Sequence, residues 1–134
     1  MKTVFVDSSV IFTAVNSPSG GSSKLFTIKN IRLITSRLVL IEVERNVRKK
    51  LLDYHLERFF LLASKLHIVE LPIDRSLISE AEKAIVKKDA AILAQAKQSG
   101  AKYLVTLDKK HFFHEKPAAF IKPAKIATPK ELLT

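Results

Sequence analysis

The stretch VFVDSSV, residues 4–10, decides the fold, because an apolar and largely β-branched run ends there at a charged side chain. Val4, Phe5 and Val6 are typical of a strand that is buried on both faces. Asp7 follows directly, and a carboxylate at the end of a buried strand costs free energy unless a partner compensates its charge. The rest of the sequence should therefore contain, or bind, the partner of Asp7.

Short apolar segments of this kind recur and alternate with stretches of helical periodicity. The expected strands are residues 3–6, 32–35, 67–71, 102–107 and 124–129. The expected helices are residues 10–16, 24–29, 37–52, 54–66, 76–87 and 88–99, with a last turn at 130–133. Apolar strands that alternate with helices predict an α/β protein, in which helices cover both faces of a parallel sheet.

Local signals set some of the expected boundaries. Ser8 or Ser9 is a suitable N-cap for the first helix, and Ser36 for the third. Gly100 is placed to end the helix at 88–99. The segment SPSGGSS, residues 17–23, has the composition of a loop.

Length and composition limit the class of protein. The 134 residues fit one domain, residues 1–134, and 47% of them are hydrophobic. The absence of cysteine excludes disulfides, thiolate nucleophiles and cysteine-ligated metals. Since no apolar run approaches the roughly 18 residues of a membrane span, and the first residues do not resemble a secretory signal, we expect a cytoplasmic protein without membrane contact.

The charge is strongly positive, with 23 Lys and Arg against 13 Asp and Glu and a formal net charge of +10. Such an excess favours a polyanionic partner, first nucleic acid and second an acidic protein segment. The alternative is a lysine-rich surface that contacts only solvent.

Acidic side chains stand at positions that a parallel sheet brings together. Asp7 and Asp108 follow expected strands, at the edge where ligands bind in such sheets. Asp89 opens an expected helix, and Glu42 or Glu44 lies on the helix after the second strand. Converging carboxylates repel one another and stay ionised together only around a hard divalent cation such as Mg²⁺ or Mn²⁺. A metal ion is therefore a candidate partner for Asp7, and it would suit the hydrolysis of phosphodiesters.

Each acidic residue also has a simpler interpretation. Asp7 could cap the following helix, and Asp89 is favoured at a helix N-terminus by the helix dipole. Asp108 could be a turn residue, and Glu44 lies four residues before Arg48, which suits a surface ion pair. Taken singly, these signals do not identify a site.

Other kinds of catalytic site find little support. The four histidines have no zinc-ligand spacing, no G-x-S-x-G motif is present, and three glycines cannot build a phosphate-binding loop. His111 follows Asp108 by three residues, so a role near substrate is conceivable, but a packing or surface role is favoured.

Three blocks together resemble the PIN-domain family, the nucleases that include VapC-like toxins. They are VFVDSSV at 4–10, SRLVLIEVERNV at 36–47 and KDAAILAQAKQSGAKYLVTLDKKHF at 88–112. The last block is the most specific, and the tail AKIATPKELL at 124–133 is similar to the last strand of many PIN domains. The resemblance implies a Rossmann-like PIN fold with a five-stranded parallel sheet in the order 3-2-1-4-5, flanked by helices.

The resemblance also implies a site. Matched by position, the metal-binding and catalytic residues are Asp7, Glu42, Asp89 and Asp108. Helical periodicity alone favours Glu44, which borders the apolar stripe of its helix, whereas the family spacing selects Glu42. Thr106 and Ser9 match the positions of polar residues that hold a carboxylate.

The implied function is a Mg²⁺- or Mn²⁺-dependent endoribonuclease, the toxin of a toxin–antitoxin pair, which forms a homodimer and is blocked by an antitoxin protein. The alternatives are an RNA-processing PIN nuclease without an antitoxin, and a catalytically weak module that binds RNA or protein. Basic residues adjoin the acidic positions in sequence and are candidate RNA contacts. They are Arg45, Arg48, Lys49, Lys50, Lys87, Lys88, Lys109 and Lys110.

Overall fold

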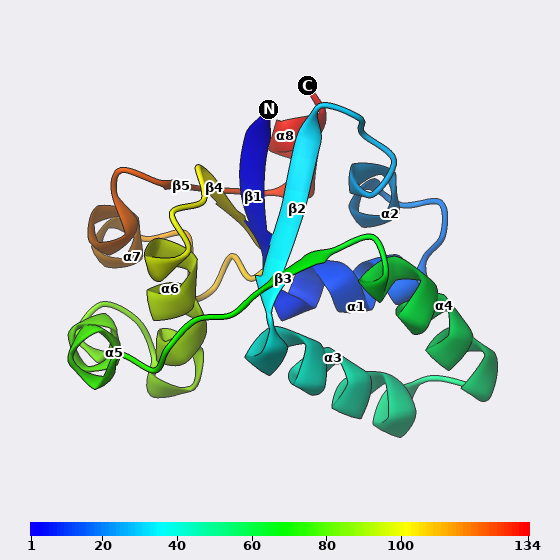
Figure 1. Cartoon of the computed structure of the whole chain (residues 1–134), viewed down its shortest axis with the longest axis horizontal. Coiled ribbons are helices and arrows are strands. Elements are labelled where there is room, and N and C mark those ends of the chain that lie inside the picture. Colours follow the sequence, from blue (N-terminus) through cyan, green and yellow to red (C-terminus); the bar gives the residue numbers. More distant parts are fainter.

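A parallel five-stranded sheet forms the centre of the molecule (Figure 1), as seen in a computed structural model that describes residues 1–134. The strand order is β3-β2-β1-β4-β5, and every neighbouring pair is parallel, so the sheet expected from the family resemblance is confirmed. The strands are β1 (Lys2–Val6), β2 (Ile31–Ser36), β3 (His67–Val69), β4 (Tyr103–Val105) and β5 (Lys125–Ala127).

Helices cover both faces of this sheet. In Figure 1, α5, α6 and α7 lie on one side of the sheet, and α1, α2 and α4 lie on the other. Helix α3 runs beside α1, below the carboxyl ends of the strands. The helices are α1 (Ser8–Asn16), α2 (Gly21–Leu25), α3 (Arg37–Lys50), α4 (Asp53–Ala63), α5 (Arg75–Glu82), α6 (Lys87–Gln98), α7 (Glu115–Ile121) and α8 (Pro129–Leu133). None of them is long and apolar enough to cross a membrane.

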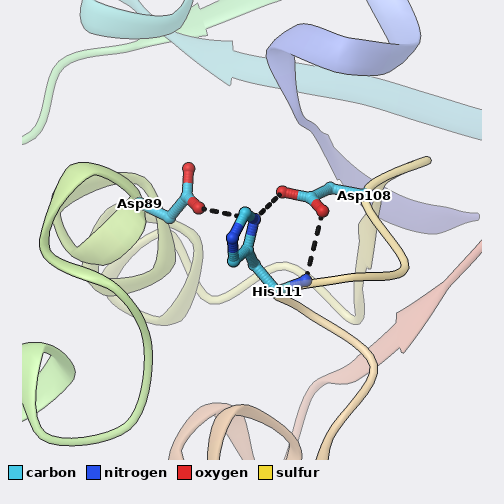
Figure 2. Close-up of side chains that lie close together, drawn as sticks. All are labelled: Asp89, Asp108 and His111. Atoms are coloured by element: carbon cyan, nitrogen blue, oxygen red, sulfur yellow. Dashed lines mark hydrogen bonds and ion pairs between the residues drawn. The ribbon is translucent and has the colours of Figure 1, made fainter.

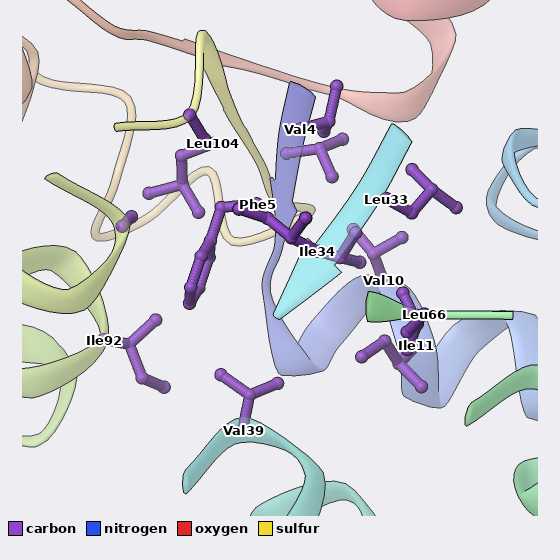
Figure 3. Close-up of a cluster of buried hydrophobic side chains, with 14 of the residues drawn as sticks. Val4, Phe5, Val10, Ile11, Leu33, Ile34, Val39, Leu66, Ile92 and Leu104 are labelled. Carbon is purple, nitrogen blue, oxygen red and sulfur yellow. The ribbon is translucent and has the colours of Figure 1, made fainter. Parts of the chain in front are cut away.

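The central strand β1 carries the core on both of its faces. Phe5 pairs in register with Ile34 of β2 and Leu104 of β4, and all three side chains are buried. Figure 3 shows Phe5 on the side of Ile92 in α6, whereas Leu33 points to the opposite face. Because side chains alternate along a strand, one apolar run fills two layers of core at once.

The same register brings the carboxyl ends of β1 and β4 side by side. Val6 pairs with Val105, and the backbone N–H of Asp7 donates to the carbonyl of Val105 at 3.0 Å. The two segments that carry Asp7 and Asp108 therefore leave the sheet at adjacent points.

Two of the expected helix boundaries are confirmed. The Ser36 hydroxyl accepts a hydrogen bond from the Val39 N–H at 3.3 Å, which caps α3, and it donates to Gln95 of α6 at 2.6 Å. Gly100 follows α6 with a φ of +74°, a left-handed conformation that glycine adopts at little cost.

The expected cap of α1 was wrong. The N-cap position belongs to Asp7, and Ser8 and Ser9 lie inside the first turn. The side chain of Asp7 makes no hydrogen bond to the helix backbone, because it is engaged elsewhere.

The segment at 17–23 is only partly a loop, because α2 begins within it at Gly21 and ends before Phe26. Ser23, which the sequence places among loop residues, is buried, and its hydroxyl contacts the carbonyls of Ala14 at 3.0 Å and Ser17 at 2.5 Å. These tertiary contacts order a segment whose local composition favours a turn.

The region after α4 also differs from expectation. The helix expected at 76–87 ends at Glu82, because the chain turns at Val86 to start α6, while Ile85 packs into the core. Helix α7 was not expected; its Pro117 lies in the first turn, where a missing N–H is tolerated.

Candidate active site

Asp7 is held by two hydroxyl groups. Its side chain is buried, with 4% of its surface exposed, and its Oδ2 accepts hydrogen bonds from Ser9 Oγ and Thr106 Oγ1, both at 2.7 Å. The same hydroxyls accept the backbone N–H groups of Leu107 at 3.0 Å and Asp108 at 3.1 Å, respectively. The hydroxyl pair thus fixes the position of the segment after β4 relative to the carboxylate after β1.

The other carboxylate oxygen of Asp7 is nearly free. Its only hydrogen-bond contact is with Ser8 Oγ at 3.5 Å, the limit of such a bond. Capping of α1 does not explain Asp7, since no helix N–H reaches it. One oxygen is therefore used for positioning, and the other is available to a ligand.

Asp89, Asp108 and His111 form a compact group beside Asp7. Figure 2 shows the imidazole of His111 between the two carboxylates. Its Nδ1 lies 2.8 Å from Asp108 Oδ2 and 3.6 Å from Asp89 Oδ2, and the His111 backbone N–H donates to Asp108 Oδ1 at 3.1 Å. One potential ligand atom from each of the three residues lies within 4.8 Å of the other two, which is close enough for a shared cation.

The electrostatics of this group disfavour negative charge on Asp89. Burial is the main factor that raises the pKa of Asp89, and the nearby carboxylates of Asp108 and Asp7 raise it further. Lys88 and His111 lower the pKa but do not reverse the shift. An added positive charge would therefore be favourable here.

Glu42 and Glu44 have different surroundings. Glu42 has a buried Oε2 without any hydrogen-bond partner, in a small hollow between α3 and α6 that Arg45 and Lys88 also line. Glu44 pairs instead with Arg48 at 3.0 Å, and its side chain is 39% exposed. The geometry thus gives Glu44 the surface role and leaves Glu42 with an unused oxygen.

The four acidic positions identified from sequence are therefore not equivalent. Asp89 and Asp108 are brought together directly, and Asp7 joins them through the hydroxyl pair. Glu42 comes from α3 and shares its hollow with Lys88, the residue that precedes Asp89. No hydrogen bond links Glu42 to the other three carboxylates.

The arrangement fits a divalent cation. Glu42 Oε2 and Asp89 Oδ2 are buried oxygens that lack hydrogen-bond partners, which is costly unless something else pairs with them. The carboxylate oxygens are hard donors of the kind that Mg²⁺ and Mn²⁺ prefer, whereas the His111 ring contacts Asp108.

The sequence underestimated His111. We favoured a packing or surface role, whereas the structure places the ring, only 18% exposed, in contact with Asp108. The spacing Asp108-x-x-His111 is the available signal, because it allows one turn of chain to return the ring to the carboxylate.

The basic residues that flank the acidic positions in sequence are scattered in space. Arg45 and Lys88 line the hollow of Glu42, and Lys110 lines a groove that His111 closes. Lys50 shares a hollow with Ser9. The others take no part in these hollows, and Arg48 is neutralised by Glu44; they are Arg48, Lys49, Lys87 and Lys109.

The parallel sheet has the order 3-2-1-4-5, and carboxylates follow its adjacent strands β1 and β4. In α/β proteins of this class, the carboxyl edge of the sheet is the usual place for a ligand. A family model of the PIN domain matches residues 4–118. The chain therefore belongs to the PIN-domain family, a family of nucleases.

Solved structures share the fold across nearly the whole chain. VapBC2 from Rickettsia felis, bound to a promoter DNA fragment, has a TM-score of 0.71 at 20% identity, covering 94% of this chain and 98% of that one. DNA-bound VapBC from Salmonella typhimurium has a TM-score of 0.68 at 16% identity, covering 96% and 99%. VapC20 from Mycobacterium tuberculosis, described as a Sarcin-Ricin loop cleaving toxin, has a TM-score of 0.58 at 16% identity, covering 80% and 91%. No curated protein sequence matches this chain.

Proposed function

We propose that this protein is a Mg²⁺- or Mn²⁺-dependent endoribonuclease that serves as the toxin of a toxin–antitoxin pair. The observation that carries the proposal is the set of carboxylates at one sheet edge, two of which have buried oxygens without hydrogen-bond partners. The chain is a PIN domain with a net charge of +10. A metal site that acts on a polyanion would account for the clustered carboxylates and for the positive net charge.

Asp7, Glu42, Asp89 and Asp108 would hold the metal. When bound, the metal would lower the pKa of a water molecule and stabilise the charge that develops on the phosphate. Asp7 and Asp108 follow β1 and β4, whereas Glu42 and Asp89 lie on α3 and α6. The hydrogen bond from the Asp108 N–H to Thr106 Oγ1 holds the segment after β4 against the sheet. Attack by water rather than by the ribose 2′-hydroxyl would leave a 5′-phosphate and a 3′-hydroxyl.

Three residues would orient these ligands. Ser9 and Thr106 hold one oxygen of Asp7, so the other oxygen keeps one direction. His111 contacts both oxygens of Asp108 through its ring and its backbone N–H. A fixed set of ligands lowers the cost of organising the site when substrate arrives.

The toxin assignment is supported by the structural neighbours, whose names describe VapBC complexes and an RNA-cleaving toxin. We propose an antitoxin protein and a second copy of the chain as partners. Helix α4 offers apolar side chains for such contacts, because Tyr54, Phe60 and Leu61 are each more than half exposed. Sedimentation of the purified chain, alone and with the product of any small adjacent reading frame, tests both partners.

The activity is tested by incubating the protein with structured RNA in Mg²⁺, in Mn²⁺ and in EDTA. We expect cleavage with either metal, none in EDTA, and none with Asp7→Asn. Glu42→Gln should abolish cleavage, whereas the matched control Glu44→Gln, two residues along the same helix, should retain it. Cleavage that survives in EDTA or in Asp7→Asn would refute the metal mechanism.

A further inference from the structure

A groove with several charged side chains lies beside the acidic group, between the segment that follows α5 and the start of α7. It has a volume of about 630 Å³, and its charged and imidazole side chains are Lys83, Lys110, His111, His114, Glu115 and Lys116. Lys83 follows α5, Lys110 lies in the segment after β4, and Lys116 lies on α7. Three segments distant in sequence thus supply one lysine each to the same groove.

The lysines of the groove have no acidic partner within the chain. The ion pairs of the molecule are Arg37–Glu70, Arg48–Glu44 and the contacts of His111 with Asp89 and Asp108. Three unpaired lysines therefore face a groove that contains one glutamate, so a bound anion would meet a net positive surface.

The groove adjoins the candidate active site through His111. His111 lines the groove and at the same time lies 2.8 Å from Asp108 Oδ2. The hollow of Glu42, between α3 and α6, carries two further cations, Arg45 and Lys88. Cations thus lie on two sides of the acidic group, in the hollow of Glu42 and in the groove that His111 lines.

We infer that the groove of Lys83, Lys110 and Lys116 binds the RNA strand next to the phosphate that is cut. The inference rests on the proposed function, because it assigns the groove to the substrate of that site. Lysines act as point charges on phosphates and do not read bases, so the groove contributes affinity and register rather than sequence preference. Its three unpaired lysines favour a phosphate backbone over a neutral ligand.

The test compares two triple variants of equal net charge. One is Lys83→Gln/Lys110→Gln/Lys116→Gln. The control is Lys24→Gln/Lys29→Gln/Lys130→Gln, three exposed lysines in or near α2 and α8, away from the groove. Binding of a fluorescent single-stranded oligoribonucleotide is followed by anisotropy in EDTA, so that cleavage does not interfere, over a range of salt concentrations.

Each phosphate contact on a single strand contributes roughly 0.7 to the slope of log affinity against log salt. The groove variant should therefore lose roughly 2 from the slope and bind roughly 100-fold more weakly at 0.1 M salt, while the control stays near the wild type. The loss should appear in KM when cleavage is measured in Mg²⁺. Equal slopes and affinities for the two variants would overturn the inference. If the triple variant does not fold, each single substitution should still lower the slope by roughly 0.7.

The outcomes separate this inference from the nuclease proposal. If the wild type cleaves RNA and the groove variant binds RNA as well as the control does, the groove assignment is refuted and the nuclease proposal stands. Wild type that binds RNA through these lysines but never cleaves it refutes the nuclease and leaves the groove assignment standing. If the wild type does not bind RNA, the assignment of the groove to RNA is overturned. The same holds if the three lysines bind a poly-glutamate peptide and not RNA.

Discussion

Replacement of Thr106 by valine should destabilise the fold well beyond the effect of an ordinary hydroxyl. The Thr106 side chain is fully buried, donates to the Asp7 carboxylate at 2.7 Å and accepts the Asp108 N–H at 3.1 Å. A hydrogen bond to a charged group contributes about 1.5–3 kcal/mol, and the backbone N–H left without a partner adds about 1 kcal/mol. We therefore expect Thr106→Val to lower the free energy of unfolding by roughly 2–4 kcal/mol.

Thr35→Val is the matched control for this prediction. Thr35 is equally buried, but its hydroxyl donates to the neutral carbonyl of Val6 at 2.9 Å. Its replacement should cost about 1 kcal/mol, the usual net contribution of a neutral hydrogen bond. The difference between the two losses in free energy of unfolding measures the contribution of the charge on Asp7.

Urea denaturation in EDTA, followed by circular dichroism, gives both free energies of unfolding from the midpoints and slopes. Equal losses for Thr106→Val and Thr35→Val would refute the argument that the hydroxyl pair stabilises a buried carboxylate. A second measurement, Mg²⁺ titration by calorimetry, should show weaker binding only for Thr106→Val, since that hydroxyl also positions the Asp108 segment.

Three further predictions concern single residues. Because the pKa of Asp89 is raised by burial and by neighbouring carboxylates, its ionisation destabilises the fold as pH rises from the ordinary aspartate pKa through the raised one. Asp89→Asn should therefore raise the melting temperature at pH 7 in EDTA, with a smaller gain near pH 4 in a pH series of thermal melts; a variant less stable than wild type at pH 7 contradicts this. Saturating Mg²⁺ should raise the melting temperature of wild type and of Glu44→Gln but not of Glu42→Gln. Without metal, Glu44→Gln should lower the free energy of unfolding by less than about 1 kcal/mol, because the Glu44–Arg48 pair is exposed. Gly100→Ala should lower the free energy of unfolding by about 1 kcal/mol, because a φ of +74° is unfavourable for alanine, although nothing lies within 4 Å of the added Cβ. An unchanged midpoint in urea denaturation would exclude that strain.

The sheet could be predicted from sequence because its signals are local. Each strand is a short apolar run, and Val4, Phe5 and Val6 show burial on both faces without any neighbour being known. Ser36 and Gly100 mark helix ends through their own backbone preferences. The strand order, in contrast, followed from the family resemblance, because no local signal in the chain decides which strands pair.

The parts that sequence missed depend on contacts between distant segments. Helix α2 begins inside an apparent loop because the buried Ser23 contacts Ala14 of α1 and Ser17, which follows α1. Helix α7 contains Pro117 in its first turn, and a proline in the sequence suggests a break in a helix. The sequence favours a packing or surface role for His111 and does not show its contact with Asp89, because the two residues are 22 positions apart. For the acidic residue of α3, helical periodicity favours Glu44 and the family spacing selects Glu42; the unsatisfied oxygen of Glu42 and the surface ion pair of Glu44 agree with the family spacing.

The hydroxyl bridge from Thr106 to Asp7 spans 99 positions of the chain. Strand β4, which precedes Thr106, pairs with β1 and is synthesised only after about three-quarters of the chain. Until Thr106 and Asp108 are in place, no amino-terminal fragment contains the complete acidic set or the groove beside it. If the proposed function holds, a nascent or truncated chain would not cleave RNA, and activity would begin only after most of each molecule has been synthesised.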